Sequence, residues 1–248
     1  HGENLFCSGY PKNDLLFSAT PNYGLWKNRK SIKVIWAPHW SVLTHESLGN
    51  FDRYAKPLFK YLETHPKVEI ILKPHPLLRR RMTDPTLKRL FERLDVSGTY
   101  HEPIDFATPE DFDNFIEEWK SLPNAGFMDS GDYFGLFKSS DAMILDSGSF
   151  IAEYMTMDKP MCYCNRDRTL DAFLGMFNEF AQDLLLSMTI ANSIDEVIRF
   201  LDDISHGEDE LKENRHNMIN KHLSVNKFHV GQTIANHIED TLLNTKAN

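Results

Sequence analysis

The sequence predicts an α/β fold in which helices cover both faces of a parallel, Rossmann-like sheet. Short apolar runs alternate along the chain with segments of helical periodicity. The runs are continuously apolar, which is typical of strands buried on both faces. Polar clusters directly follow three of them, at residues 39–46, 73–76 and 146–149. Ligands of such sheets bind beyond the carboxyl ends of the strands, so the three clusters indicate one shared site.

Five apolar segments of four or five residues carry the strand prediction. They are Ile32–Trp36, Val68–Leu72, Ala125–Met128, Ala142–Leu145 and Met161–Cys164. Between and after them, large apolar residues recur at helical spacing. Five helices are expected over Phe51–Leu62, Asp132–Phe137, Ser193–Asp203, Leu211–Leu223 and Val230–Leu242. Two more are expected to begin near Thr83–Pro85 and at Thr108–Pro109. A capping box of Ser193 and Glu196 is expected at the start of the Ser193–Asp203 helix.

Residues 1–30 are rich in Pro, Asn, Gly and Lys and show little periodicity. They predict an interdomain linker or domain edge, with one domain over residues 31–248. The formal net charge is −9 and no basic face stands out apart from Arg79–Arg81, so a nucleic-acid partner is not expected. No apolar run approaches the length of a membrane span. Cys162 and Cys164 would share one side of a strand with no second pair to complete a zinc site, so neither a metal nor a cofactor is expected.

The segment 139–164 has the pattern of a strand–turn–helix–strand unit. Ala142–Leu145 is followed by the turn Asp146-Ser147-Gly148-Ser149 and then by apolar residues at helical spacing. Backbone N–H groups at a helix N-terminus bind phosphate, so this turn is a candidate phosphate site. The alternative is an ordinary N-cap turn, in which Asp and Ser are favoured for structural reasons. A carboxylate would repel a phosphate, so Asp146 is expected to orient the loop.

His75 lies between two prolines directly after a predicted strand, in the run Lys73-Pro74-His75-Pro76. The prolines restrict the backbone, so the imidazole is expected to be held where it can donate to a phosphate oxygen. The alternative is a turn histidine that caps the strand end.

Each of the other candidates has a structural alternative. Glu153 is a candidate for binding ribose hydroxyls, and the alternative is a solvated helix carboxylate with no ligand. Arg215 is a candidate cation or part of a solvated helix face. His39 and Ser41 line the first strand-to-helix turn, where polar residues are common without any function.

The combination of GYPKND (9–14), WAPHW (36–40), LKPHP (72–76) and SDAMILDSGSFIAEYMTMDKPMCYC (140–164) resembles the CDP-glycerol glycerophosphotransferase family. Members of that family build teichoic acids and related capsular polymers. The family usually carries D-Y-S-S where this chain has Asp146-Ser147-Gly148-Ser149, and APTW where it has APHW. The resemblance implies the C-terminal, donor-binding half of a two-domain GT-B enzyme, with GYPKND at the crossing from an N-terminal acceptor domain.

The resemblance also implies roles for individual residues. His75 would be the catalytic group on the donor pyrophosphate, with Ser147 and Ser149 near the phosphates and Glu153 toward the nucleoside. Arg215 would correspond to a basic residue near the donor. The substrate-binding set implied in this way is His39, Ser41, Lys73, Asp146, Ser147, Gly148, Ser149, Glu153 and Arg215.

The implied reaction transfers glycerol phosphate, or a related polyol phosphate, from a CDP-activated donor to a hydroxyl of a growing cell-surface polymer, with release of CMP. It implies a cytoplasmic protein at the inner face of the plasma membrane, which meets its acceptor and the membrane through the other domain. Two alternatives remain open. One is the donor half of a GT-B glycosyltransferase that uses a UDP- or CMP-sugar, and the other is a non-catalytic nucleotide- or phosphate-binding module.

Overall fold

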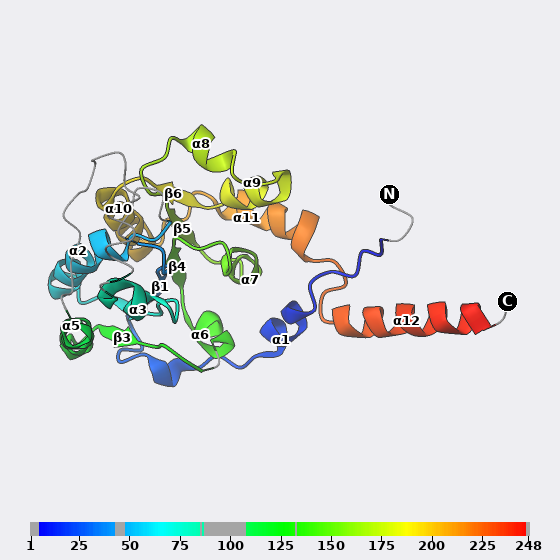
Figure 1. The fold of residues 1–248 in the computed structure, drawn as a ribbon, viewed down its shortest axis with the longest axis horizontal. Helices are drawn as coiled ribbons and strands as arrows, with labels where there is room; N and C mark the ends of the chain where they lie inside the picture. Colours follow the sequence, from blue (N-terminus) through cyan, green and yellow to red (C-terminus); the bar gives the residue numbers. More distant parts are fainter. Residues whose placement is uncertain (1–4, 43–47, 85, 87–107, 132, 247–248) are drawn as a thin grey trace.

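A single parallel sheet organises the molecule. The computed structural model describes residues 5–42, 48–84, 86, 108–131 and 133–246. Within these residues the strands lie in the order β3-β2-β1-β4-β5-β6 (Figure 1). Their bounds are Ile32–Ala37 (β1), Val68–Leu72 (β2), Ala125–Phe127 (β3), Ala142–Leu145 (β4), Met161–Cys164 (β5) and Thr189–Ala191 (β6). Every neighbouring pair is parallel, so all the carboxyl ends lie at one edge of the sheet.

Helices cover both faces of the sheet, as predicted. Val34 and Trp36 pack into one core with α2 (Phe51–Thr64), α5 (Pro109–Ser121) and α10 (Ile194–Ser205). Ile35 and Ala37, which alternate with them along β1, pack into a second core on the other face. This second core includes side chains of α1 (Lys12–Ser18), α6 (Phe134–Ser139), α7 (Ile151–Met155), α8 (Leu170–Leu174), α9 (Glu179–Leu185) and α11 (Lys212–Met218). Because each strand is buried on both sides, the α/β fold class with a doubly covered sheet is confirmed.

The five predicted strands are confirmed, with shifts of one residue at the ends of β1 and β3. The sixth strand, β6, was missed because three residues that begin with a threonine form no apolar run. Helix α3 (Leu78–Thr83) ends where the sequence predicted a helix to begin, and the rest of that predicted helix lies outside the described residues. The predicted Leu211–Leu223 helix is α11 continued by a π-helical segment, Ile219–Leu223.

Two helix starts show which capping interactions form. Thr108 and Asp111 make a complete capping box at α5, with Pro109 at the first helical position. At α10 only half of the predicted box forms. Ser193 accepts from the N–H of Glu196, but the Glu196 carboxylate accepts from the N–H of Asn192 instead of that of Ser193.

The first thirty residues contain more structure than their composition predicted. Within them, α1 places Leu16 in the second core, and a short 3-10 helix, Tyr23–Leu25, precedes Trp26, which is also buried there. The long helix α12 (Val230–Lys246) follows α11 and projects from the rest of the fold, close to the N-terminal segment (Figure 1). The domain boundary near residue 30 stays a prediction.

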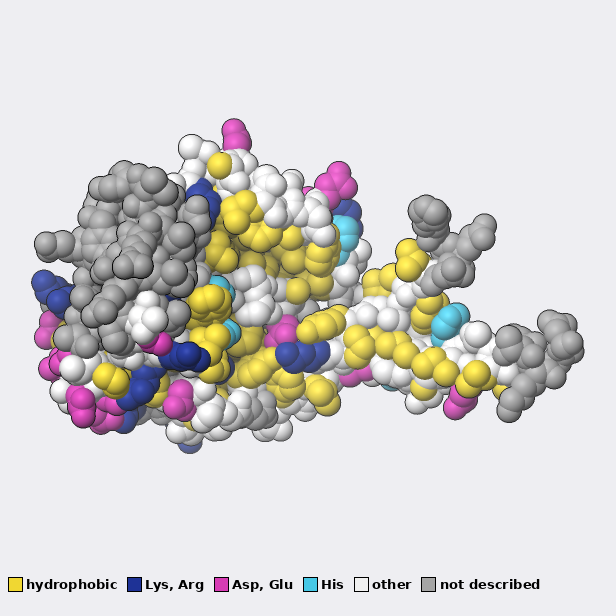
Figure 2. All heavy atoms as spheres, in the orientation of Figure 1, with side chains coloured by type: hydrophobic (Ala, Val, Ile, Leu, Met, Phe, Trp, Pro, Cys, Tyr) yellow, Lys and Arg dark blue, Asp and Glu magenta, His cyan; other side chains and the backbone are white. Residues whose placement is uncertain are grey.

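The surface shows no concentration of basic charge on the face in view. Figure 2 shows Lys and Arg scattered among Asp and Glu there, with hydrophobic side chains along α12. The arginine triplet does not form one patch, because Arg81 is buried, Arg79 pairs with Asp113 and Arg80 lies near Asp84. Of the helices described, none is long and apolar enough to cross a membrane. Cys162 and Cys164 are buried in the same core, which confirms that they share one side of β5.

Candidate functional site

The polar residues that follow β1, β2 and β4 meet at the carboxyl edge of the sheet. The N–H of Lys73 donates to the Trp36 carbonyl at 2.7 Å, and the N–H of His75 donates to the Pro38 carbonyl at 3.1 Å. The turn after β2 therefore runs beside the turn after β1. The N–H of His39 in turn donates to the Asp146 carboxylate at 2.5 Å, which joins the turn after β4 to the other two.

The imidazoles of His39 and His75 lie 5.8 Å apart, measured between ring centroids. Nδ1 of His75 accepts from the N–H of Leu77 at 3.2 Å. Nδ1 of His39 accepts from the N–H of Ser41 at 3.1 Å and is 2.7 Å from its hydroxyl, which itself accepts from the N–H of Leu48. This pattern assigns the ring proton of each neutral imidazole to Nε2. Both rings thus present an Nε2–H donor.

Burial sets the charge of these two rings. Burial and then the nearby His75 lower the pKa of His39 to about 4. Burial also lowers the pKa of His75 from its usual value of 6.5. Both groups are therefore neutral donors at pH 7 in the absence of ligand, and an anion placed between them would raise both pKa values.

Lys73 is buried, and its side-chain ammonium makes no hydrogen bond or ion pair with any residue the structure describes. Its Nζ lies 5.6 Å from the ring centroid of Tyr133 and 6.0 Å from that of Phe150. Burial lowers the pKa of its ammonium, while the charge of Asp129 acts in the opposite direction. A desolvated ammonium held against two aromatic rings and lacking an acceptor is a strong candidate for binding an anion.

Asp146 is buried and holds two of the site's backbone segments together. Its side chain accepts from two backbone N–H groups, that of His39 on Oδ1 and that of Asn50 on Oδ2 at 2.6 Å. Asp146 is 1% exposed, and burial raises its pKa to about 7. The expectation that Asp146 orients the loop agrees with this geometry, and its inclusion among the substrate-binding residues stays a prediction.

The serines of the turn after β4 do not cap the helix that follows. The N-cap of α7 is Phe150, and α7 is only five residues long, so the field of its N-terminus is weak. The hydroxyls of Ser147 and Ser149 instead bond to each other at 2.8 Å. A Cβ added to Gly148 would meet nothing within 4 Å. The turn thus offers hydroxyls beside open space, without a strong helix dipole.

Glu153 is a buried acceptor rather than a solvated carboxylate. Its Oε1 accepts from the Tyr10 hydroxyl at 3.1 Å and from the Lys12 ammonium at 2.7 Å. Its Oε2 accepts from the Tyr133 hydroxyl at 2.8 Å. Because Tyr133 also lies against Lys73, the carboxylate and the unpaired ammonium belong to one cluster.

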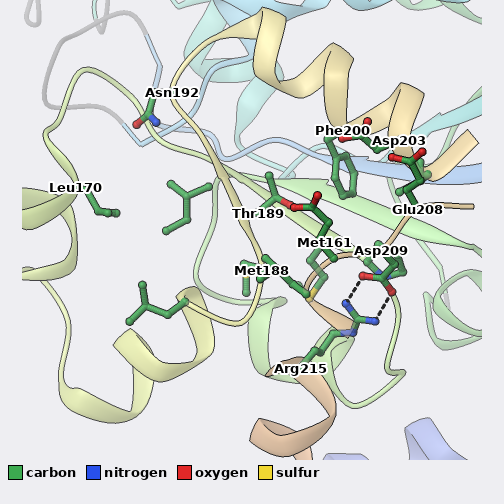
Figure 3. A pocket seen from close by; sticks show the side chains of 16 residues that line it. Met161, Leu170, Met188, Thr189, Asn192, Phe200, Asp203, Glu208, Asp209 and Arg215 are labelled. Atoms are coloured by element: carbon green, nitrogen blue, oxygen red, sulfur yellow. Dashed lines mark hydrogen bonds and ion pairs between the residues drawn. The ribbon is translucent and has the colours of Figure 1, made fainter. Parts of the chain in front are cut away.

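Arg215 does not lie with the other candidates. Its buried guanidinium pairs with Asp158 at 3.1 Å and with Asp209 at 2.7 Å. Asp158 precedes β5, so this cluster lies toward the amino ends of the strands. Figure 3 shows Arg215 and Asp209 beside Met161 in a cavity of about 370 Å³. Arg215 thus lies apart from the other candidate residues, and its expected role near the donor stays a prediction.

A second cavity, of about 330 Å³, adjoins His75. It lies between the 74–76 turn and α5, and Phe127 and Asp129 also line it. No residue of the 146–149 turn lines this cavity. That turn is connected to His75 through His39, whose N–H bonds to Asp146 and whose ring lies near the ring of His75. Within the described residues no group of three or more His, Cys, Asp or Glu is placed to hold a metal ion.

Sequence reasoning missed four residues of this cluster. Tyr10 and Lys12 belong to the GYPKND motif, which was used for the resemblance but not for the site. Tyr133 and Phe150 look like ordinary core aromatics in the sequence. Only the motif carried a signal that could have identified its two residues.

No protein-family model and no curated protein matches the sequence. Among solved structures, the wall teichoic acid polymerase TagF matches with a TM-score of 0.57 and 18% identity over 99% of this chain and 54% of its own. Staphylococcus aureus MnaA, solved with UDP, matches with a TM-score of 0.55 and 14% identity over 98% of this chain and 56% of its own. A UDP-N-acetylglucosamine 2-epimerase matches with a TM-score of 0.52 and 10% identity over all of this chain and 53% of its own.

This chain has the fold of one Rossmann-like half of a GT-B protein. It spans about half the length of these solved chains. At such low identity the likeness concerns the fold alone.

Proposed function

We propose that this chain is the donor-binding half of a transferase that moves glycerol phosphate, or a related polyol phosphate, from a CDP-activated donor to an acceptor hydroxyl. The observation that carries the proposal is the convergence, at one edge of the sheet, of two imidazole Nε2–H donors and the buried Lys73 ammonium, which has no acceptor among the described residues. These groups complement a pyrophosphate without a resident metal. The resemblance of the motifs and the fold shared with TagF support the choice of donor class.

In the proposed reaction, the acceptor oxygen attacks the phosphorus that carries the polyol. The bond between that phosphorus and the bridging oxygen breaks, and CMP leaves. Lys73 offsets charge on the pyrophosphate, and Nε2–H of His75 donates to the leaving phosphate. The acceptor proton passes to a general base, which we place on an acceptor-binding domain outside this chain. The protein's contribution is positioning and charge compensation.

A second candidate is a donor half that binds a UDP-sugar, because two of the structural neighbours are a protein solved with UDP and a UDP-N-acetylglucosamine 2-epimerase. Calorimetric titration of the whole chain with CDP-glycerol, CDP-ribitol, CMP and a UDP-sugar separates the two candidates. We expect the CDP-alditols to bind most tightly. Preference for the UDP-sugar would favour the second candidate, and no binding by any nucleotide would overturn the proposal.

The variant His75→Ala tests the role of the imidazole. It should weaken CDP-glycerol binding more than CMP binding, and it should lower turnover about 10²-fold in an enzyme that includes the acceptor half. His206→Ala, which removes an exposed histidine at the end of α10, is the matched control. Equal behaviour of the two variants would exclude His75 from the reaction.

A further inference from the structure

The surroundings of Glu153 are unusually well defined for a carboxylate beside a candidate nucleotide site. Its side chain is 6% exposed, and three donors from two distant parts of the chain converge on it. Two of them, Tyr10 and Lys12, come from the GYPKND segment, and the third is the hydroxyl of Tyr133. A carboxylate oxygen accepts two hydrogen bonds readily. Oε1 is therefore fully used by the protein, while Oε2 keeps one acceptor position for another hydroxyl.

Lys12 supplies the countercharge of this buried carboxylate, at 2.7 Å. Burial acts to lower the pKa of the Lys12 ammonium, but its hydrogen bonds to Glu153 and Tyr133 and the attraction of the carboxylate outweigh this effect and raise that pKa. The ion pair is only partly exposed to solvent, because the side chain of Lys12 is 37% exposed and that of Glu153 is buried. Removal of the ammonium would leave Glu153 buried without a countercharge.

The segment that carries Tyr10 and Lys12 is itself held in place at both ends. Gly9 has φ of +88°, and a Cβ there would lie 2.5 Å from the Val225 carbonyl oxygen. Asn13 is buried, and the Asp14 carboxylate accepts from the N–H groups of Val230 and Gly231 at the start of α12. Lys12 therefore approaches Glu153 from a fixed position rather than from a mobile tail.

We propose that Lys12 and Tyr10 are positioning residues that hold Glu153 with Oε2 ready to accept a ribose hydroxyl, and that they thereby set a preference for ribonucleotide over 2′-deoxyribonucleotide donors. This inference rests on the proposed function, since it assigns a specificity to the same nucleotide site. Lys12 and Tyr10 occupy Oε1 and prevent the carboxylate from rotating. Tyr133 fixes Oε2 from one side only, which leaves the remaining direction to the ligand.

The test compares the dissociation constants of CDP and 2′-deoxy-CDP by calorimetry on the whole chain. A hydrogen bond to a charged acceptor predicts that the wild-type protein prefers CDP by about tenfold to a hundredfold. In Lys12→Met this ratio should fall toward one, and Lys12→Arg should restore most of it. Lys221→Met, which removes a lysine that pairs with Asp183 on the surface, is the matched control and should keep the wild-type ratio.

Two further variants separate the ways in which the inference can fail. Tyr10→Phe deletes only a hydroxyl and should reduce the ratio even if Lys12→Met does not fold. Glu153→Gln should abolish the preference. If it does so while Lys12→Met and Tyr10→Phe keep the wild-type ratio, the positioning role is wrong and the nucleotide site stands. If the wild-type protein binds neither nucleotide, the proposed function fails and this inference fails with it.

Discussion

At the scale of single residues, the site depends on side chains that use some of their polar atoms for hydrogen bonds within the protein and leave others for a ligand. His39 and His75 each use Nδ1 to accept from a backbone N–H two residues later, which directs Nε2–H outward. Asp146 uses both carboxylate oxygens to hold the backbone of His39 and Asn50. The result is a preorganised set of donors, because no side chain has to rearrange before an anion arrives.

The lowered pKa of His39 predicts a pH-dependent stability. Its pKa is about 4 in the folded protein against 6.5 for an ordinary histidine, so the unfolded chain binds the proton more readily between these values. Stability should therefore fall as the pH is lowered from 6.5 to 4, by about 1–3 kcal/mol from this residue. In His39→Asn, the amide oxygen can replace Nδ1 as acceptor, but the side chain does not titrate.

Urea denaturation of both proteins at pH 7 and pH 5 provides the measurement. Both proteins should lose stability over this interval because other groups titrate in both. The variant should lose less than the wild-type protein, because it lacks the contribution of His39. An identical loss in the two proteins would contradict the assignment of a neutral, buried ring to His39.

At the scale of elements, the helices that frame the site are stabilised mainly at their ends. The capping box of Thr108 and Asp111 begins α5, whose buried Phe112, Phe115, Ile116 and Trp119 pack in the core beside β1 and β3. Helix α5 also supplies Asp113, which pairs with Arg79 at the cavity next to His75. The start of this helix therefore affects both the core and one wall of the candidate site.

Thr108→Ala should lower the free energy of unfolding by about 1–2 kcal/mol, because it removes the acceptor for the N–H of Asp111. Chemical denaturation measures the change. The control is Thr64→Ala. It removes an exposed threonine at the C-terminal end of a different helix, α2, where the hydroxyl caps no backbone N–H group. A loss no larger than that of the control would show that the box contributes little.

At the scale of the whole molecule, residues 9–14 connect two regions that are distant in sequence, α7 and α12. Tyr10 and Lys12 contact Glu153 on α7, and Asp14 caps α12. The exposed apolar residues of α12 include Ile238, Leu242 and Leu243. Helix α12 projects from the rest of the fold (Figure 1). Asp14 holds its first turn, and Phe6 stacks on His237 further along the helix. The GYPKND segment thus ties the candidate site to the terminal helix.

Asp14→Ala should loosen α12 and leave the sheet intact. Two backbone N–H groups lose their acceptor and the favourable charge at the helix N-terminus disappears, so we expect faster hydrogen exchange throughout residues 230–246. Hydrogen-exchange mass spectrometry measures this, with Asp240→Ala, a change within α12 itself, as the control. Unchanged protection of α12 in Asp14→Ala would mean that other contacts hold the helix.

Local patterns in the sequence were enough to predict most of the elements and the fold class. Continuous apolar runs marked β1 to β5 correctly, and helical spacing marked α2, α5, α10 and α12, because these patterns depend on residues close together in the chain. The polar clusters after β1, β2 and β4 could be grouped for the same reason, since parallel strands place their carboxyl ends at one edge. β6 could not be predicted, because three residues carry too little periodicity.

Which side chains come into contact could be seen only in the folded protein. Glu153 reads in the sequence as a helix carboxylate, yet residues more than 140 positions away bury it and bond to it. Arg215 reads as a helix cation, yet it lies beyond the opposite end of the strands and pairs with Asp209 and Asp158. The physical reason is that local periodicity reports which face of an element is buried. The order of strands in the sheet determines what that face is buried against.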